Sequence, residues 1–102
     1  MQEQLAEYQF HQLNSEPPIN RLLRLLNIGI FASQNKQQER IVKVILLLNR
    51  SLESEKWPEL ADNLSKLYSH LLYLTEQQQY DEIQRIFLRL YNQWQKTTIT
   101  NK

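Results

Sequence analysis

The feature that most constrains this chain is how few turns it can make, because its 102 residues include one glycine and three prolines. A protein built from many short strands needs a turn about every 8 to 12 residues, and such turns draw on glycine and proline. Hydrophobic residues make up 41% of the chain and charged residues 23%, which is enough apolar material for a packed core. The sequence therefore predicts one all-α domain spanning residues 1–102.

Apolar residues recur at helical spacing in four segments separated by polar tracts. The predicted helices span residues 18–33, 36–52, 58–74 and 80–95. Short connections join antiparallel neighbours, so we expect a compact antiparallel up-and-down bundle of about four helices. Residues 1–16 are predicted to form a loosely ordered N-terminal arm, and residues 97–102 a frayed tail.

Each predicted helix has one apolar stripe for the core and further apolar residues outside it. The core stripes are Ile19, Leu22, Leu23, Leu26 and Ile30; Ile41, Val44, Ile45, Leu48 and Leu52; Leu60, Leu64, Leu67, Leu71 and Leu74; and Ile83, Ile86, Phe87, Leu90 and Trp94. A helix that is apolar on more than one side either lies between neighbours or binds a partner. The helix at 36–52 is the candidate for a central helix. Four helices cannot all be central, so the pattern favours at least one hydrophobic groove between helices.

Residues that could catalyse a reaction or bind a metal form no recognisable constellation. Neither His11 nor His70 has a second ligand at metal-binding spacing. Ser65 and Ser69 lie one turn apart beside His70 on one helix but lack an orienting acid. The carboxylates at residues 53–62 lie near a predicted helix start, where capping and the helix dipole explain them. We therefore expect no enzymatic activity, no cofactor and no metal.

Charge and composition also exclude several classes of partner. The formal net charge is +1, and twelve Lys and Arg are interspersed with eleven Asp and Glu, whereas a nucleic-acid footprint is a basic patch. The N-terminus has no basic region followed by an apolar one. The longest apolar run, residues 41–48, is interrupted by Lys43 and is far shorter than the roughly 18–20 residues of a membrane helix. The absence of cysteine is compatible with a reducing compartment. We expect a cytoplasmic protein that binds no nucleic acid and does not insert into a membrane.

The stretches 60–74 and 80–94, joined by a polar turn, resemble the C-terminal half of the flagellin-specific export chaperones, the FliS family. The residues that carry the resemblance are Asn63, Leu64, Leu67, Tyr68 and Trp94, with looser matches at Ser51-Leu52, Gly29 and the Tyr8 to Pro18 interval. The chain departs from the family between Gly29 and the Ser51-Leu52 pair, where it has about fifteen fewer residues than the resemblance implies; a loss of about two helical turns from each side of the first hairpin would leave its register intact.

The resemblance implies a cytosolic chaperone that binds the disordered C-terminal segment of flagellin in hydrophobic grooves. Such binding prevents premature polymerisation and keeps the client competent for type III export, through helix-in-groove recognition. It also implies that the N-terminal arm, with Tyr8, Phe10 and Leu13, covers part of the groove. The residues expected to contact or border the client are Leu25, Ile28, Val42, Leu46, Tyr68, Leu72, Tyr73 and Leu88.

The shortened hairpin leaves other readings open, because shorter helices offer less surface to a long ligand. One alternative is a helical interaction module that serves another secreted client or forms a homodimer through its extra apolar face. Another is a small helical regulator or nucleic-acid binder, which the interspersed charge disfavours.

Overall fold

The structure, a computed structural model, describes residues 18–100 and consists of four helices. These are α2 (Pro18–Gln34), α3 (Gln38–Arg50), α4 (Pro58–Glu76) and α5 (Tyr80–Thr100). Within residues 18–100 there is no strand, so the predicted all-α fold is confirmed. The predicted arm at residues 1–16, including Tyr8, Phe10 and Leu13, lies outside the described residues.

The end of the last helix differs from the prediction. Helical backbone continues through Thr100, beyond the predicted helix end at residue 95 and into the segment whose lack of apolar periodicity had led us to expect a frayed tail. No glycine or proline follows Tyr80 to end the helix. Threonine costs only a few tenths of a kcal/mol relative to better helix formers, which is too little to stop a helix that is already packed.

Two turns of the same kind connect α2 to α3 and α4 to α5. In each, one residue adopts a left-handed backbone conformation, Lys36 with φ 54° and Gln78 with φ 57°. Both turns close with the paired hydrogen bonds of a Schellman motif. In the first turn, the amide of Lys36 donates to the carbonyl oxygen of Ser33 at 3.3 Å, and the amide of Gln37 donates to that of Ala32 at 2.9 Å. In the second turn, the amide of Gln78 donates to the carbonyl oxygen of Thr75 at 3.1 Å, and the amide of Gln79 donates to that of Leu74 at 3.0 Å. The connections are therefore short and well defined although neither contains glycine.

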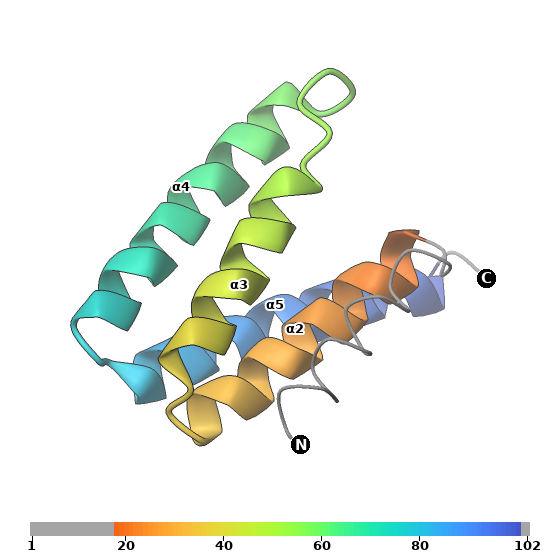
Figure 1. Cartoon of the computed structure of the whole chain (residues 1–102). Coiled ribbons are helices and arrows are strands. Elements are labelled where there is room, and N and C mark those ends of the chain that lie inside the picture. Colours follow the sequence, from red (N-terminus) through yellow and green to blue (C-terminus); the bar gives the residue numbers. More distant parts are fainter. Residues whose placement is uncertain (1–17, 101–102) are drawn as a thin grey trace.

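The four helices form two antiparallel pairs, α2 with α5 and α3 with α4 (Figure 1). The pairs meet near the two Schellman turns and diverge toward the opposite end. There the loop at residues 51–57 lies well apart from the start of α2 and the end of α5 (Figure 1). The largest helix interface is between α2 and α5, and the smallest is between α4 and α5. The bundle is therefore tightly packed at one end and more open at the other.

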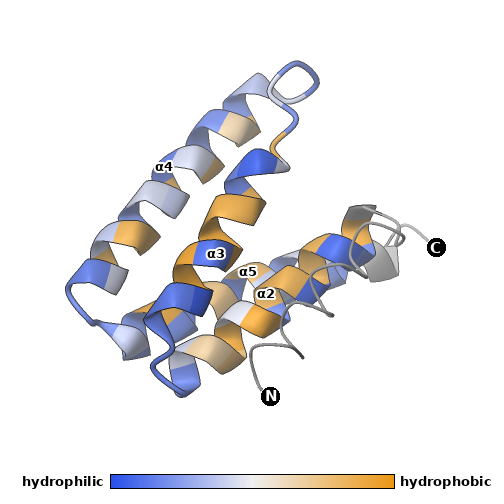
Figure 2. Ribbon diagram, viewed as in Figure 1, coloured by the Kyte–Doolittle hydropathy of each residue, from blue (hydrophilic) through white to orange (hydrophobic). Residues whose placement is uncertain are grey.

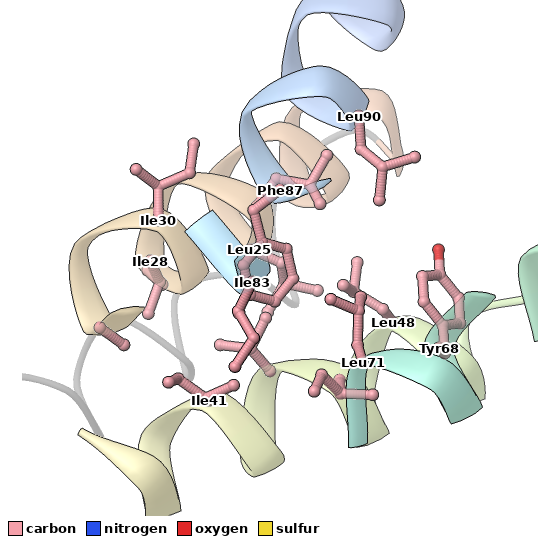
Figure 3. Close-up of a cluster of buried hydrophobic side chains, with 14 of the residues drawn as sticks. Leu25, Ile28, Ile30, Ile41, Leu48, Tyr68, Leu71, Ile83, Phe87 and Leu90 are labelled. Atoms are coloured by element: carbon pink, nitrogen blue, oxygen red, sulfur yellow. The ribbon is translucent and has the colours of Figure 1, made fainter. Parts of the chain in front are cut away.

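The helix with the most extensive contacts is α2, which packs against both α3 and α5. Hydrophobic residues extend along most of α2, whereas the turns are hydrophilic (Figure 2). The buried side chains from all four helices meet in one cluster, part of which is drawn in Figure 3. The members of that cluster on α2 are Leu25, Leu26, Ile28, Ile30 and Ala32. The sequence had indicated the helix at 36–52 as the candidate for a helix between two neighbours, and the structure places α3 between α2 and α4.

Gly29 is the point of closest approach between α2 and α5. A Cβ added at Gly29 would lie 2.9 Å from Cε2 and 3.0 Å from Cζ of Phe87. The Phe87 ring is fully buried and occupies the space that a side chain at residue 29 would need. The single glycine of the chain therefore serves helix packing and not a turn.

The buried serine and threonine hydroxyl groups, those of Ser33 and Thr75, donate hydrogen bonds within their own helices. Ser33 Oγ donates to the carbonyl oxygen of Ile30 at 2.7 Å, and Thr75 Oγ1 donates to the carbonyl oxygen of Leu71 at 2.7 Å. Among the described side chains, no buried polar atom lacks a hydrogen-bond partner. The core is thus complete as it stands and presents no polar group that calls for a ligand.

Candidate functional site

Three of the residues expected to contact a client are core residues. Leu25 and Ile28 are buried because α2 is covered by both α3 and α5. Tyr68 is buried on the side of α4 that faces Leu48 of α3 (Figure 3). The expectation that Leu25, Ile28 and Tyr68 border the client surface is corrected accordingly.

The clearest exposed apolar feature at an expected position is the pair Val42 and Leu46, referred to below as the apolar pair. Leu46 is 52% exposed and Val42 is half-buried. They lie four residues apart on α3 and therefore one above the other on one face. The core side of α3 is made by Ile41, Val44, Ile45 and Leu48, so the apolar pair faces away from the interior. An exposed leucine above a half-buried valine is a suitable anchor point for the apolar face of another helix.

The remaining expected residues are distributed over two other helices. Leu72 on α4 is half-buried against the core, while Tyr73 on α4 and Leu88 on α5 are exposed. Tyr73 follows Leu72 directly, so the two point about 100° apart around α4. The structure thus places five of the eight expected residues at or near the surface, on α3, α4 and α5, without gathering all five into one site.

The sequence reasoning missed three exposed apolar residues, Phe31, Trp57 and Leu60. Phe31 is 60% exposed and Trp57 62%. Leu60 belongs to the stripe predicted for the core, yet it is 44% exposed, and the next two members of that stripe, Leu64 and Leu67, are only half-buried. Leu60, Leu64 and Leu67 belong to the N-terminal half of α4, which lies at the end of the bundle where the helix pairs diverge (Figure 1). We call Leu60, Leu64 and Leu67 the α4 stripe.

The polar candidates for catalysis do not come together. Ser69 and His70 are exposed, and the ring of His70 stacks on that of Tyr73 with centroids 6.3 Å apart. Two of the carboxylates near the start of α4 and α5 form ion pairs along their own helices, Asp62 with Lys66 at 3.1 Å and Glu82 with Arg85 at 2.8 Å. In the part of the chain that the structure describes, no three His, Asp or Glu residues lie close enough together to hold a metal ion.

The buried phenol of Tyr68 should make the fold less stable at high pH. Burial raises the pKa of Tyr68 from 10.0 to about 12, because the ionised phenolate would lose its hydration inside the core. The contribution of the neutral phenol to the free energy of unfolding is therefore complete below pH 10. As the pH rises from 10 to about 12, the free energy of unfolding falls by about 2–3 kcal/mol. Urea denaturation across that range should show a smaller loss for Tyr68→Phe than for the natural chain. Equal losses would contradict the prediction.

Comparison of the chain with protein families, with curated proteins and with solved structures finds no match. No helix formed by the described residues has the length and apolar character needed to cross a membrane. The candidate site is therefore defined by the chain's own geometry, as apolar side chains left exposed on a bundle whose core is already complete.

Proposed function

We propose that this protein is a non-enzymatic binding protein that takes up an amphipathic segment of another protein on its exposed apolar surface. The observation that carries the proposal is the apolar pair, Val42 and Leu46, which faces outward although the core beneath it is fully formed. Exposed leucines and aromatic residues at helical spacing are typical of surfaces that bind helices.

The resemblance of residues 60–74 and 80–94 to the flagellin-specific export chaperones supplies the specific form of the proposal. In that form the protein is a cytoplasmic chaperone that holds the disordered C-terminal segment of flagellin, prevents its premature polymerisation and keeps it fit for type III export. The apolar pair would then accept short amphipathic helices that the client forms on binding. The alternative is a helical interaction or homodimerising module without specificity for flagellin.

The test is a titration of the purified chain with a synthetic C-terminal flagellin segment, comparing the natural chain with the double variant Val42→Thr and Leu46→Gln. We expect the affinity to fall at least about tenfold, which corresponds to about 1.4 kcal/mol, because one buried anchor residue typically accounts for that much. Helical content and thermal stability should change little, since Leu46 is more than half exposed.

The matched control is Phe31→Gln, which removes an equally exposed side chain from α2 and should leave client affinity unchanged. An affinity that does not differ between the double variant and the natural chain would contradict the proposed surface. Light scattering tests the homodimer alternative. A natural chain that forms a stable dimer, and a double variant that does not, would assign the apolar pair to self-association.

A further inference from the structure

The two hairpins of the bundle, α2 with α3 and α4 with α5, repeat one another along the chain. Their Schellman turns are centred on Lys36 and Gln78, which lie 42 residues apart. Three residues before each of these positions is a buried residue whose hydroxyl donates to a carbonyl oxygen of its own helix, Ser33 in the first hairpin and Thr75 in the second. The same turn is therefore built twice, with a fixed offset between the two copies.

Side-chain identity and exposure repeat at the same offset. Leu46 and Leu88 are 52% and 40% exposed, and Phe31 and Tyr73 are 60% and 56% exposed. Core packing does not require exposed leucine and aromatic residues to coincide in this way, so the bundle is a twofold repeat of one helical hairpin. The identical pairs are Leu22 and Leu64, Leu25 and Leu67, Gln37 and Gln79, Ile41 and Ile83, Leu46 and Leu88, and Leu48 and Leu90.

The contacts between helices obey the same repeat. The first helix of each hairpin packs against the second helix of the other, α2 against α5 and α4 against α3. Within residues 18–100, no close backbone contact joins α2 to α4 or α3 to α5. Interchanging the two hairpins therefore carries each helix interface onto another interface of the bundle. The hairpins are linked by the loop at residues 51–57, whose side chains are exposed apart from that of half-buried Leu52.

The interface between the hairpins favours unlike partners. Where α2 meets α5, Gly29 leaves room for the ring of Phe87. The residues at the equivalent positions are Leu71 on α4 and Ile45 on α3, both fully buried. Two first hairpins together would set glycine against isoleucine and leave a cavity, and two second hairpins would set leucine against phenylalanine and overfill the site. Each hairpin is therefore shaped to pair with the other kind.

We propose that a second copy of this chain is a partner for the first, and that the two copies exchange hairpins. In the exchanged dimer, α2 and α3 of each copy pack against α4 and α5 of the other. Both arrangements contain the same helix interfaces, and only the loop at residues 51–57 changes its course. The apolar pair stays on the surface and takes no part, so the exchange does not rest on the proposed function.

The balance between monomer and exchanged dimer depends on the loop. In the monomer, the seven residues between α3 and α4 hold the two hairpins together at an effective concentration in the millimolar range. The core contacts are equal in the two arrangements, so this concentration sets the midpoint. The natural chain should be a monomer at about 10 μM and a mixture of monomer and dimer after refolding at about 1 mM.

The test mixes two full-length variants, each of which fills the α2–α5 contact badly on its own. Gly29→Leu overfills the site against Phe87, and Phe87→Ile leaves a cavity beside Gly29. Each variant alone should melt at least about 5 °C below the natural chain. In an exchanged pair, the introduced leucine meets the introduced isoleucine, as at Leu71 and Ile45, and the other contact is the natural one.

We expect the equimolar mixture, refolded together from urea at about 100 μM, to form a dimer with one chain of each variant. If each contact is worth a factor of about ten, correcting both favours the exchange about a hundredfold and brings its midpoint to about 10 μM. Light scattering gives the mass and native mass spectrometry the composition. The dimer should melt above either variant alone, including a variant that does not fold by itself.

The matched control mixes Gly29→Leu with Leu88→Ala, whose substitution lies on the exposed side of α5 and should give no mixed dimer. In the natural chain, Val42→Thr with Leu46→Gln should leave the dimer formed at about 1 mM unchanged. A mixture of Gly29→Leu and Phe87→Ile that stays monomeric, or that pairs at random, would overturn the proposal. So would variants as stable as the natural chain, or a dimer that is lost when the apolar pair is changed.

Discussion

Replacing Phe87 with alanine should reduce the free energy of unfolding by about 3–5 kcal/mol. Phe87 is fully buried between α5 and α2, the pair of helices with the largest interface in the bundle, and its ring lies against Gly29. Removing the ring would leave a cavity at the centre of the cluster drawn in Figure 3. A domain of this size has a total stability of about 5–15 kcal/mol, so this loss is a large fraction of it. Urea denaturation followed by the helical circular-dichroism signal measures the change.

The matched control for this substitution is Leu88→Ala, one residue further along α5. Leu88 is 40% exposed, so its truncation removes less buried surface than that of Phe87 and should cost about 1–2 kcal/mol. Equal destabilisation by Phe87→Ala and Leu88→Ala would contradict the burial of the Phe87 ring between α5 and α2.

Replacing Gly29 with valine should destabilise the fold by about 2–3 kcal/mol, although valine is the better helix former. The gain in helix propensity over glycine is only about half a kcal/mol. The Cβ alone would come within 2.9 Å of the Phe87 ring, and the two methyl groups of valine add further overlap. Neither the ring nor the α2 backbone can move freely, because the ring is enclosed in the core.

A double-mutant cycle isolates this contact. Leucine at residue 87 has no ring edge at the position of the clash, so Gly29→Val should cost at least about 1 kcal/mol less in the Phe87→Leu background than in the natural chain. Additive effects of the two substitutions would mean that the cost of valine at residue 29 arises elsewhere than at Phe87.

The number and placement of the helices could be predicted because both depend on local features of the chain. The periodic spacing of leucine and isoleucine marks each helix, and the polar tracts near Lys36 and Gln78 mark the turns, so the predicted boundaries agree to within about two residues except at the end of α5. The pairing of α2 with α5 was not predictable in the same way. Helical periodicity tells which residues share a face, but the neighbour that covers a second face, as α5 covers α2, comes from a distant part of the sequence.

The same distinction explains what was right and wrong about the candidate site. Leu46 lies outside the core stripe of its helix and is exposed, as its spacing indicates. Leu25 and Ile28 also lie outside their stripe, yet they are buried because α2 is covered on two sides. Leu60 shows the opposite error, since it lies within a stripe but belongs to the part of α4 where the helix pairs diverge (Figure 1). Periodicity gives the direction of a side chain, and only the tertiary structure shows whether another helix extends far enough to cover it.

The dominance of the α2–α5 interface has a consequence for how the chain is made. Protein synthesis proceeds at about 5–20 residues per second, and α5 leaves the ribosome after the other three helices. Until Ile83, Phe87 and Leu90 emerge, the leucine and isoleucine side chains of α2 that they cover remain open to water. The nascent chain therefore exposes the hydrophobic face of α2 for several seconds. Premature termination within α5 would yield a product prone to aggregation and degradation.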